Sequence, residues 1–157
     1  TRPRSFSSCR FKTDICFDLV DVVSYNIYPK WYHNTPVAEY LDDLYKWVQT
    51  TGGAGKPFLI TEVGAGAIYG YRTQAKAKWS EEYQVLALEE QLGAILSYKD
   101  CSGVYIWQFC DVRVTNDWWN TRPRTMNNKG IVDEYRRPKL SYETVKRIFG
   151  SVDTYRK

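Results

Sequence analysis

Histidine and methionine are the scarcest residues in this chain of 157 residues, which has one of each. The lone histidine is His33, and the four cysteines (Cys9, Cys16, Cys101 and Cys110) have a spacing that matches no zinc pattern. We therefore expect neither a metal nor a cofactor. Without such a role, the cysteines are interpreted as reduced thiols, which favours a cytoplasmic setting.

Long apolar runs and a strong charge are missing too. No stretch approaches the roughly 20 apolar residues that cross a bilayer, and residues 1–6 lack the apolar core of a signal peptide. The net charge of +4 is scattered, without a basic stripe or a nucleic-acid motif. We expect neither a membrane nor a nucleic acid as partner. Because the first residue is not methionine, we also expect that the chain does not begin at a native start.

Aromatic residues are abundant instead and make up 16% of the chain. Many lie in polar, turn-rich stretches such as 25–32 and 69–71. Aromatic faces in loops stack on planar or CH-rich ligands, among which sugars are common. Anchoring of the loops onto the core is an equally good interpretation of any one of these residues.

The apolar patterns alternate between strand and helix. Short apolar runs predict strands at residues 20–25, 58–61 and 104–109, and residues 4–7 could form part of another. Helical periodicity predicts three helices: Thr35 can cap the first, Ser80 caps the second and Pro138 opens the third. The expected inward faces of the last two helices are Val85, Leu88, Leu92, Ile95 and Leu96, and then Leu140, Val145, Ile148 and Phe149.

This alternation implies parallel strands covered by helices, and hence an α/β fold. The loops after the strands are longer and richer in Gly, Asn, Tyr and Trp than the loops before them. A (β/α)₈ barrel with its site on the C-terminal face has this asymmetry, although such a barrel needs eight strands and about 250 residues.

Glu62 is the most informative single residue. It ends the apolar run 58–62 and precedes the glycine-rich turn 63–66. An unpaired ionised acid in an apolar setting costs several kcal/mol or shifts its pKa. The end of a parallel strand is also where α/β enzymes place their chemistry. We therefore treat Glu62 as a candidate catalytic acid, with a salt-bridged structural acid as the alternative.

A family resemblance rests on motifs that occur in order along nearly the whole chain. They are Thr61–Ala65, Ser24–Tyr32, Trp79–Gln84, Ile106–Asp111, Asn127–Ile131 and Arg137–Lys139. Together they resemble glycoside hydrolase family 2, and its β-glucuronidase branch most of all. The resemblance implies that residues 1–157 form the C-terminal half of a (β/α)₈ TIM barrel, about strands five to eight. The preceding β-sandwich domains and first half-barrel would be absent from this chain.

The resemblance also implies roles for individual residues. Glu62 matches the nucleophile, and Tyr28 is placed to donate a hydrogen bond to it. Trp107 matches a wall of the sugar site, while Asn26 and Tyr32 are weaker candidates for substrate binding. The general acid/base glutamate of the family follows an asparagine, and this chain contains no Asn-Glu dipeptide.

Asn127 and Lys129 form an Asn-x-Lys motif, in which an amide and an ammonium could converge on one carboxylate. In the β-glucuronidase branch such a motif recognises the carboxylate of the sugar. Read without the family context, the motif is a surface turn. Asp111 is expected to order the cleft by hydrogen bonding, and Glu81 to be an ordinary acid at a helix start.

We therefore hypothesise that the chain is part of a retaining glycosidase, which hydrolyses β-D-glucuronides through a covalent glycosyl-enzyme. Its partners would be the carbohydrate substrate and the remaining N-terminal part of the same enzyme, with a homo-oligomer at full length. The alternatives are a β-galactosidase of the same family, a non-catalytic sugar-binding half-barrel, and a structural fragment without a function of its own.

Overall fold

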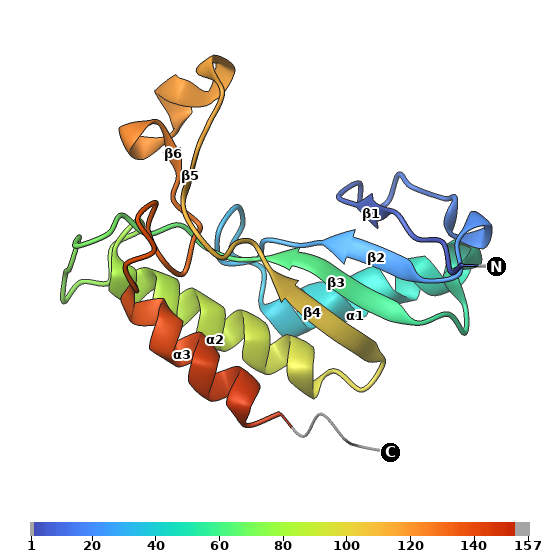
Figure 1. Ribbon diagram of the computed structural model, residues 1–157. Coiled ribbons are helices and arrows are strands. Elements are labelled where there is room, and N and C mark those ends of the chain that lie inside the picture. Colours follow the sequence, from blue (N-terminus) through green and yellow to red (C-terminus); the bar gives the residue numbers. More distant parts are fainter. Residues whose placement is uncertain (1, 153–157) are drawn as a thin grey trace. The chain divides into compact units, whose positions relative to one another are not determined.

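The computed structural model describes residues 2–152, and residue 1 and residues 153–157 of the expected half-barrel lie outside them. The chain divides into two compact units (Figure 1). Thr1–Val63 and Ala94–Ile106 form the first unit, and Gly64–Gly93 and Trp107–Lys157 form the second unit. Each unit carries some of the predicted site residues, so each is described by itself.

A four-stranded parallel sheet forms the centre of the first unit. Its strands are β1 (Ser7–Ser8), β2 (Val23–Asn26), β3 (Phe58–Val63) and β4 (Cys101–Ile106), and they lie side by side in chain order. The α/β class and the parallel pairing predicted from the alternation are confirmed. Parallel neighbours bring the carboxyl ends of all strands to one edge, where the sequence predicts the site.

Helix α1 (Val37–Val48) packs on this sheet. It buries Val37, Leu41, Leu44 and Val48 at the 3.6-residue spacing expected of an amphipathic helix. The ring of Tyr45 on α1 lies 5.6 Å from the ring of Phe58 on β3. The prediction that Thr35 caps this helix is wrong, because Pro36 occupies the cap position and makes no side-chain cap hydrogen bond.

Two short helical turns border α1 and the sheet. The first is η1 (Phe17–Leu19), and the second is η2 (Gln49–Gly53), which directly follows α1. Gly52 in η2 has a φ of +93°, and a Cβ there would lie 2.5 Å from the backbone nitrogen of Asp18. Only glycine fits this close approach without a shift of the chain.

Helices α2 (Glu81–Ser97) and α3 (Leu140–Gly150) lie side by side (Figure 1). Arg147 on α3 forms an ion pair of 2.7 Å with Glu89 on α2. Ser80 accepts a hydrogen bond of 3.1 Å from the backbone nitrogen of Tyr83, which confirms it as the cap of α2. The predicted faces are partly wrong, since Leu96 and Phe149 are exposed and the glutamines Gln84 and Gln91 are buried.

The long connection after residue 111 contains short elements of its own. They are β5 (Val112–Arg113), η3 (Asn116–Thr121), η4 (Pro123–Thr125) and β6 (Met126–Asn127), with β5 antiparallel to β6. The sequence predicts that this strand runs to Phe109, but β4 ends at Ile106. The reason is that Gln108 exchanges backbone hydrogen bonds of 3.0 and 3.1 Å with Lys129 and Ile131 instead of continuing the sheet.

The two positive-φ glycines after α1 provide a matched test of the packing. We expect Gly52→Ala to lower the free energy of unfolding by about 2 kcal/mol more than Gly55→Ala. Gly55 also has a positive φ, +72°, but no described atom lies within 4 Å of the place of its Cβ. Both substitutions share the backbone strain, so the difference measures the clash with Asp18. Equal losses in thermal or urea unfolding would contradict this packing.

Candidate active site

Glu62 and Tyr28 lie at the carboxyl ends of neighbouring strands. Asn26 is the last residue of β2 and pairs with Glu62 on β3, after an irregularity in register at Tyr25 and Asn26. The backbone nitrogen of Ile27 then donates a hydrogen bond of 2.8 Å to the carbonyl of Glu62. This bond continues the pairing beyond the end of β2. Tyr28 is therefore held beside the acid by the backbone itself.

The Tyr28 hydroxyl donates a hydrogen bond of 2.6 Å to Oε2 of Glu62. Hydrogen bonds to a charged acceptor are shorter and stronger than neutral ones. This bond stabilises the negative charge of the carboxylate and fixes the orientation of its oxygens. Such a held carboxylate can act as a nucleophile or as a general base.

Two further predicted residues lie in the same part of the first unit. The ring of Tyr32 meets the ring of Tyr28 edge-on at 5.3 Å, and 59% of Tyr32 is exposed, so it can offer a face to a ligand. Asn26 is less available, because its side-chain oxygen accepts a hydrogen bond of 2.8 Å from the hydroxyl of Thr61. The structure thus brings Glu62, Tyr28 and Tyr32 together and ties Asn26 to the sheet.

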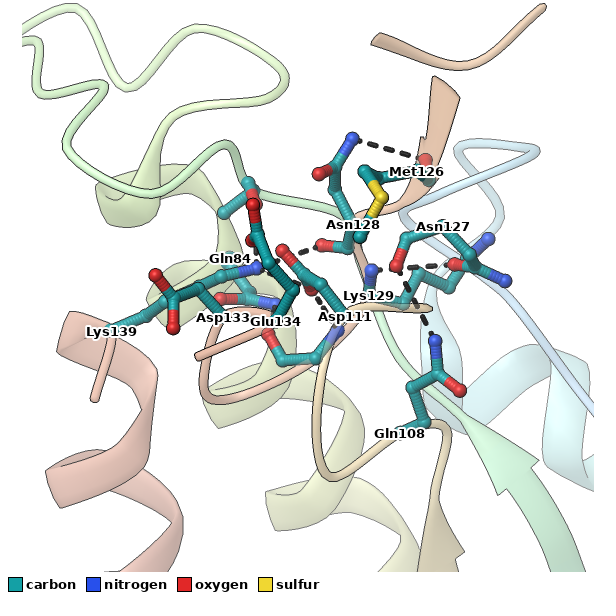
Figure 2. Close-up of polar contacts among 12 residues, drawn as sticks. Gln84, Gln108, Asp111, Met126, Asn127, Asn128, Lys129, Asp133, Glu134 and Lys139 are labelled. Carbon is teal, nitrogen blue, oxygen red and sulfur yellow. Dashed lines mark hydrogen bonds and ion pairs between the residues drawn. The ribbon is translucent and has the colours of Figure 1, made fainter. Parts of the chain in front are cut away.

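Lys129 belongs to the second unit and lies in the loop that Figure 2 shows, and only 3% of it is exposed. Its backbone nitrogen donates to the side-chain oxygen of Asn127 at 3.3 Å, and its carbonyl accepts from the backbone of Gln108 at 3.0 Å. The side-chain oxygen of Asn127 is therefore bound to the loop backbone. A surface turn, the alternative interpretation of this motif, does not agree with this burial.

Trp107 follows β4 directly, and 38% of it is exposed. Its peptide bond to Gln108 is cis. A Cβ on Gly64 would lie 2.3 Å from the carbonyl oxygen of Trp107, so this position requires glycine. The glycine-rich turn after Glu62 therefore has a steric reason, namely the close passage of the Trp107 backbone.

A buried ion pair lies behind the Lys129 loop, and sequence reasoning did not find it. Nζ of Lys139 lies 2.8 Å from Oδ1 of Asp111, and both side chains are fully buried. The same ammonium donates to the carbonyls of Ala67 and Asn128 at 2.7 and 3.1 Å. The hydrogen bonding expected of Asp111 is present. Lys139 gave no local signal, since a lysine at a helix start is normally solvated.

Glu81 also has a structural role. Only 3% of it is exposed, and its carboxylate oxygens accept hydrogen bonds of 2.7 Å from the backbone nitrogens of Gly70 and Leu140. It therefore ties the loop before α2 to the start of α3. Arg72 adds an ion pair of 3.4 Å to the same carboxylate.

Burial shifts the proton equilibria of the buried pair. It raises the pKa of Asp111 to about 6, an effect that the neighbouring Lys139 ammonium only partly offsets. Burial likewise lowers the pKa of Lys139, against the attraction of Asp111. Both shifts have the direction expected when a charged group leaves water.

Within residues 2–152, no group of three or more His, Cys, Asp and Glu side chains could hold a metal ion. All four cysteines are free thiols. No helix in this range is long and apolar enough to cross a membrane.

Residues 1–154 match a family model described as "Glycosyl hydrolases family 2, TIM barrel domain". The chain belongs to this family. The predicted family and the predicted barrel fold are therefore confirmed, and β1 to β4 are strands of a family 2 TIM barrel domain.

Curated relatives of this glycosyl hydrolase family 2 chain are much longer than the chain. The rat β-glucuronidase is 34% identical over 153 residues, which are 90% of this chain and 22% of the rat protein. A β-glucuronidase of Paenibacillus borealis is 26% identical over 137 residues, which are 86% of this chain and 22% of that protein. The chain thus spans about a fifth of the length of these relatives.

Solved family 2 structures include a closer match. A GH2 β-galacturonidase from Eisenbergiella tayi, bound to galacturonate, is 71% identical with a TM-score of 0.94, over 96% of this chain and 27% of that chain. A β-glucuronidase from Ruminococcus gnavus, in complex with D-glucuronic acid, is 26% identical with a TM-score of 0.79, over 94% of this chain and 26% of that chain.

The raised pKa of Asp111 predicts a pH dependence of stability. The folded state holds the proton up to about pH 6, whereas the ordinary value is 3.8, so the folded state binds more protons between these values. The free energy of unfolding of the wild type should therefore fall, relative to Asp111→Asn, as the pH rises from about 4 to about 6. Thermal unfolding across this range measures the difference.

The control is Asp21→Asn. The hydrogen bonds with Arg4 lower the pKa of Asp21 and outweigh the rise that burial causes. The stability that this group contributes is present above its ordinary value and is lost only as the pH falls further. Parallel curves for the wild type and Asp111→Asn would show that Asp111 titrates normally.

Proposed function

We propose that this chain is part of the catalytic barrel of a retaining β-uronidase that acts on β-galacturonides. The observation that carries the proposal is the hydrogen bond of 2.6 Å from Tyr28 to Glu62, at the carboxyl ends of adjacent parallel strands. In a TIM barrel this edge carries the active site. Glu62 is the nucleophile, and Tyr28 holds its charge and its orientation.

The reaction has two steps. A Glu62 oxygen bonds to the anomeric carbon while the bond to the aglycone oxygen breaks, and a general acid protonates that leaving oxygen. Water, deprotonated by the same group, then displaces Glu62. The second carboxyl group stands about 5–5.5 Å from the nucleophile in retaining enzymes. The acid/base glutamate comes from the part of the enzyme outside this chain.

Lys129 supports a uronide rather than a neutral sugar. Lys129 is buried, and its ammonium carries a positive charge that an anionic partner can bind. A sugar carboxylate is such a partner, and a neutral hexose lacks it, which gives selectivity between them. Trp107 and Tyr32, both partly exposed, offer aromatic faces for the ring.

The proposed sugar is galacturonate, and the relative at 71% identity, a β-galacturonidase, supports this choice. A β-glucuronide is the second candidate, since the curated relatives at 34% and 26% identity are β-glucuronidases. The two sugars differ only at C4. The residues that read C4 lie outside this chain in this proposal.

The chain completes the barrel together with an N-terminal part of the same enzyme. Among the described strands, β1 and β4 form the two edges of the sheet, each with one neighbour. Open sheet edges pair readily with further strands, and a closed barrel has none. The exposed Tyr105 on β4, with 62% of its surface open, supports further packing at that strand.

The first test uses the full-length enzyme with p-nitrophenyl β-galacturonide and β-glucuronide. We expect Glu62→Gln to lower kcat at least about 1,000-fold, because the amide cannot form the glycosyl-enzyme. A 2-fluoro-galacturonide should also leave a glycosyl group on the peptide that contains Glu62. Glu143→Gln, whose side chain is 73% exposed, is the matched control and should behave like the wild type. Full activity of Glu62→Gln would refute the nucleophile assignment.

The second test concerns the substrate carboxylate. We expect Lys129→Ala to lower the ratio of kcat/KM on p-nitrophenyl β-galacturonide to kcat/KM on the β-galactoside by about 100-fold. The exposed Lys146→Ala is the control for removal of a lysine from the same unit. Equal losses on both substrates would contradict the carboxylate role of Lys129. Uronate binding without any hydrolysis would favour a sugar-binding module.

A further inference from the structure

We propose that Lys139 and Asp111 are positioning residues that hold Lys129 in place for the substrate carboxylate. This inference rests on the proposed function of Lys129. Its basis is that both peptide groups next to Lys129 are anchored to the fully buried Lys139–Asp111 pair (Figure 2). The pair sets selectivity for uronides without contact with the sugar.

The first anchor lies on the N-terminal side of Lys129. Nζ of Lys139 donates to the carbonyl of Asn128 at 3.1 Å and to the carbonyl of Ala67 at 2.7 Å. The backbone nitrogen of Ala67 in turn donates to the same Asn128 carbonyl at 2.8 Å. Asn128 is therefore tied both to the start of α3 and to the loop that follows β3.

The second anchor lies on the C-terminal side. Oδ1 of Asp111 accepts a hydrogen bond of 2.8 Å from the backbone nitrogen of Gly130. A Cβ on Gly130 would lie 2.3 Å from the backbone nitrogen of Asp111, so the contact requires glycine. Gln84 donates to the carbonyl of Gly130 at 3.0 Å. Both polar groups of the Gly130 backbone are thus bound to buried side chains.

Both anchors depend on the same pair of opposite charges, those of Lys139 and Asp111. Lys139 and Asp111 are both fully buried, and their opposite charges leave the pair without a net charge in the second unit. Loss of the Asp111 charge would leave the ammonium of Lys139 without its ion-pair partner, in the same unit as the buried Lys129. Removal of one partner of a buried pair is costly, whereas apolar replacement of both is often tolerated. This asymmetry allows positioning to be separated from folding.

The test measures selectivity in the full-length enzyme. The readout is the ratio of kcat/KM on p-nitrophenyl β-galacturonide to kcat/KM on the β-galactoside. We expect Lys139→Gln to lower this ratio about 10-fold, mainly through a higher KM for the uronide. The double variant Asp111→Leu/Lys139→Met, which removes both buried charges, should show the same loss while it remains folded. If Lys139→Gln fails to fold, this double variant still tests the positioning role.

A merely structural role would give a different result. Val145→Ala removes buried methyl groups from α3 in the same unit, and it should reduce both activities alike if it reduces them at all. In a Lys129→Ala background, Lys139→Gln should cause no further loss of the ratio, because the pair acts through Lys129. A further 10-fold loss of the ratio there would overturn the inference.

The failures of the two proposals are distinguishable. If Lys129→Ala lowers the ratio and Lys139→Gln and the double variant keep the wild-type ratio, the positioning role fails and the proposed function stands. If the wild type shows no preference for the uronide and Lys129→Ala does not change the ratio, the proposed function fails and the positioning role fails with it.

Discussion

Backbone pairing between β2 and β3 is the constraint on which the first unit depends. The bond from the Ile27 nitrogen to the Glu62 carbonyl, 2.8 Å long, extends this pairing past the last residue of β2. The next residue, Tyr28, then reaches the Glu62 carboxylate at 2.6 Å. Backbone pairing costs little conformational freedom beyond that of the sheet, so the side-chain hydrogen bond forms between groups already in place.

Buried charge is the corresponding constraint in the second unit. Lys129, Lys139, Asp111, Asp133 and Glu81 are each at most 3% exposed. Glu81 accepts backbone hydrogen bonds, Asp133 pairs with Arg137, and Lys139 pairs with Asp111. Each of these bonds joins segments far apart in the sequence or fixes a turn. These bonds thereby hold together a region rich in loops.

Family membership bears on the fold of the chain, whereas the geometry of the site bears on its function. The match over residues 1–154 establishes a TIM barrel domain of glycosyl hydrolases family 2. A fold of this kind hosts many chemistries, so the function has to be argued from the site. In the proposed function, the Tyr28–Glu62 pair supplies the held carboxylate and Lys129 binds an anionic sugar. The choice of galacturonate in that proposal rests on the likeness to a β-galacturonidase at 71% identity.

Local patterns predicted the elements better than their details. The period of α1 and the cap at Ser80 were correct because both depend on residues within one or two turns. The predicted end of β4 was wrong, because the backbone of Gln108 bonds to the loop around Lys129, which comes much later in the chain. Phe149 was expected inside by periodicity and is 38% exposed, since periodicity does not say how far a neighbouring element extends.

The sequence by itself determined the α/β alternation, the place of Glu62 at a strand end and, through its motifs, the family. Only the tertiary structure decided which polar groups are buried and what they bind. The ammonium of Lys139 and the carbonyl of Ala67 are 72 residues apart in sequence, and a pattern of neighbouring residues carries no information on such a contact. A lysine at a helix start is normally solvated, but Lys139 is buried. Its charge, which is out of water, therefore needs partners that only the tertiary structure supplies.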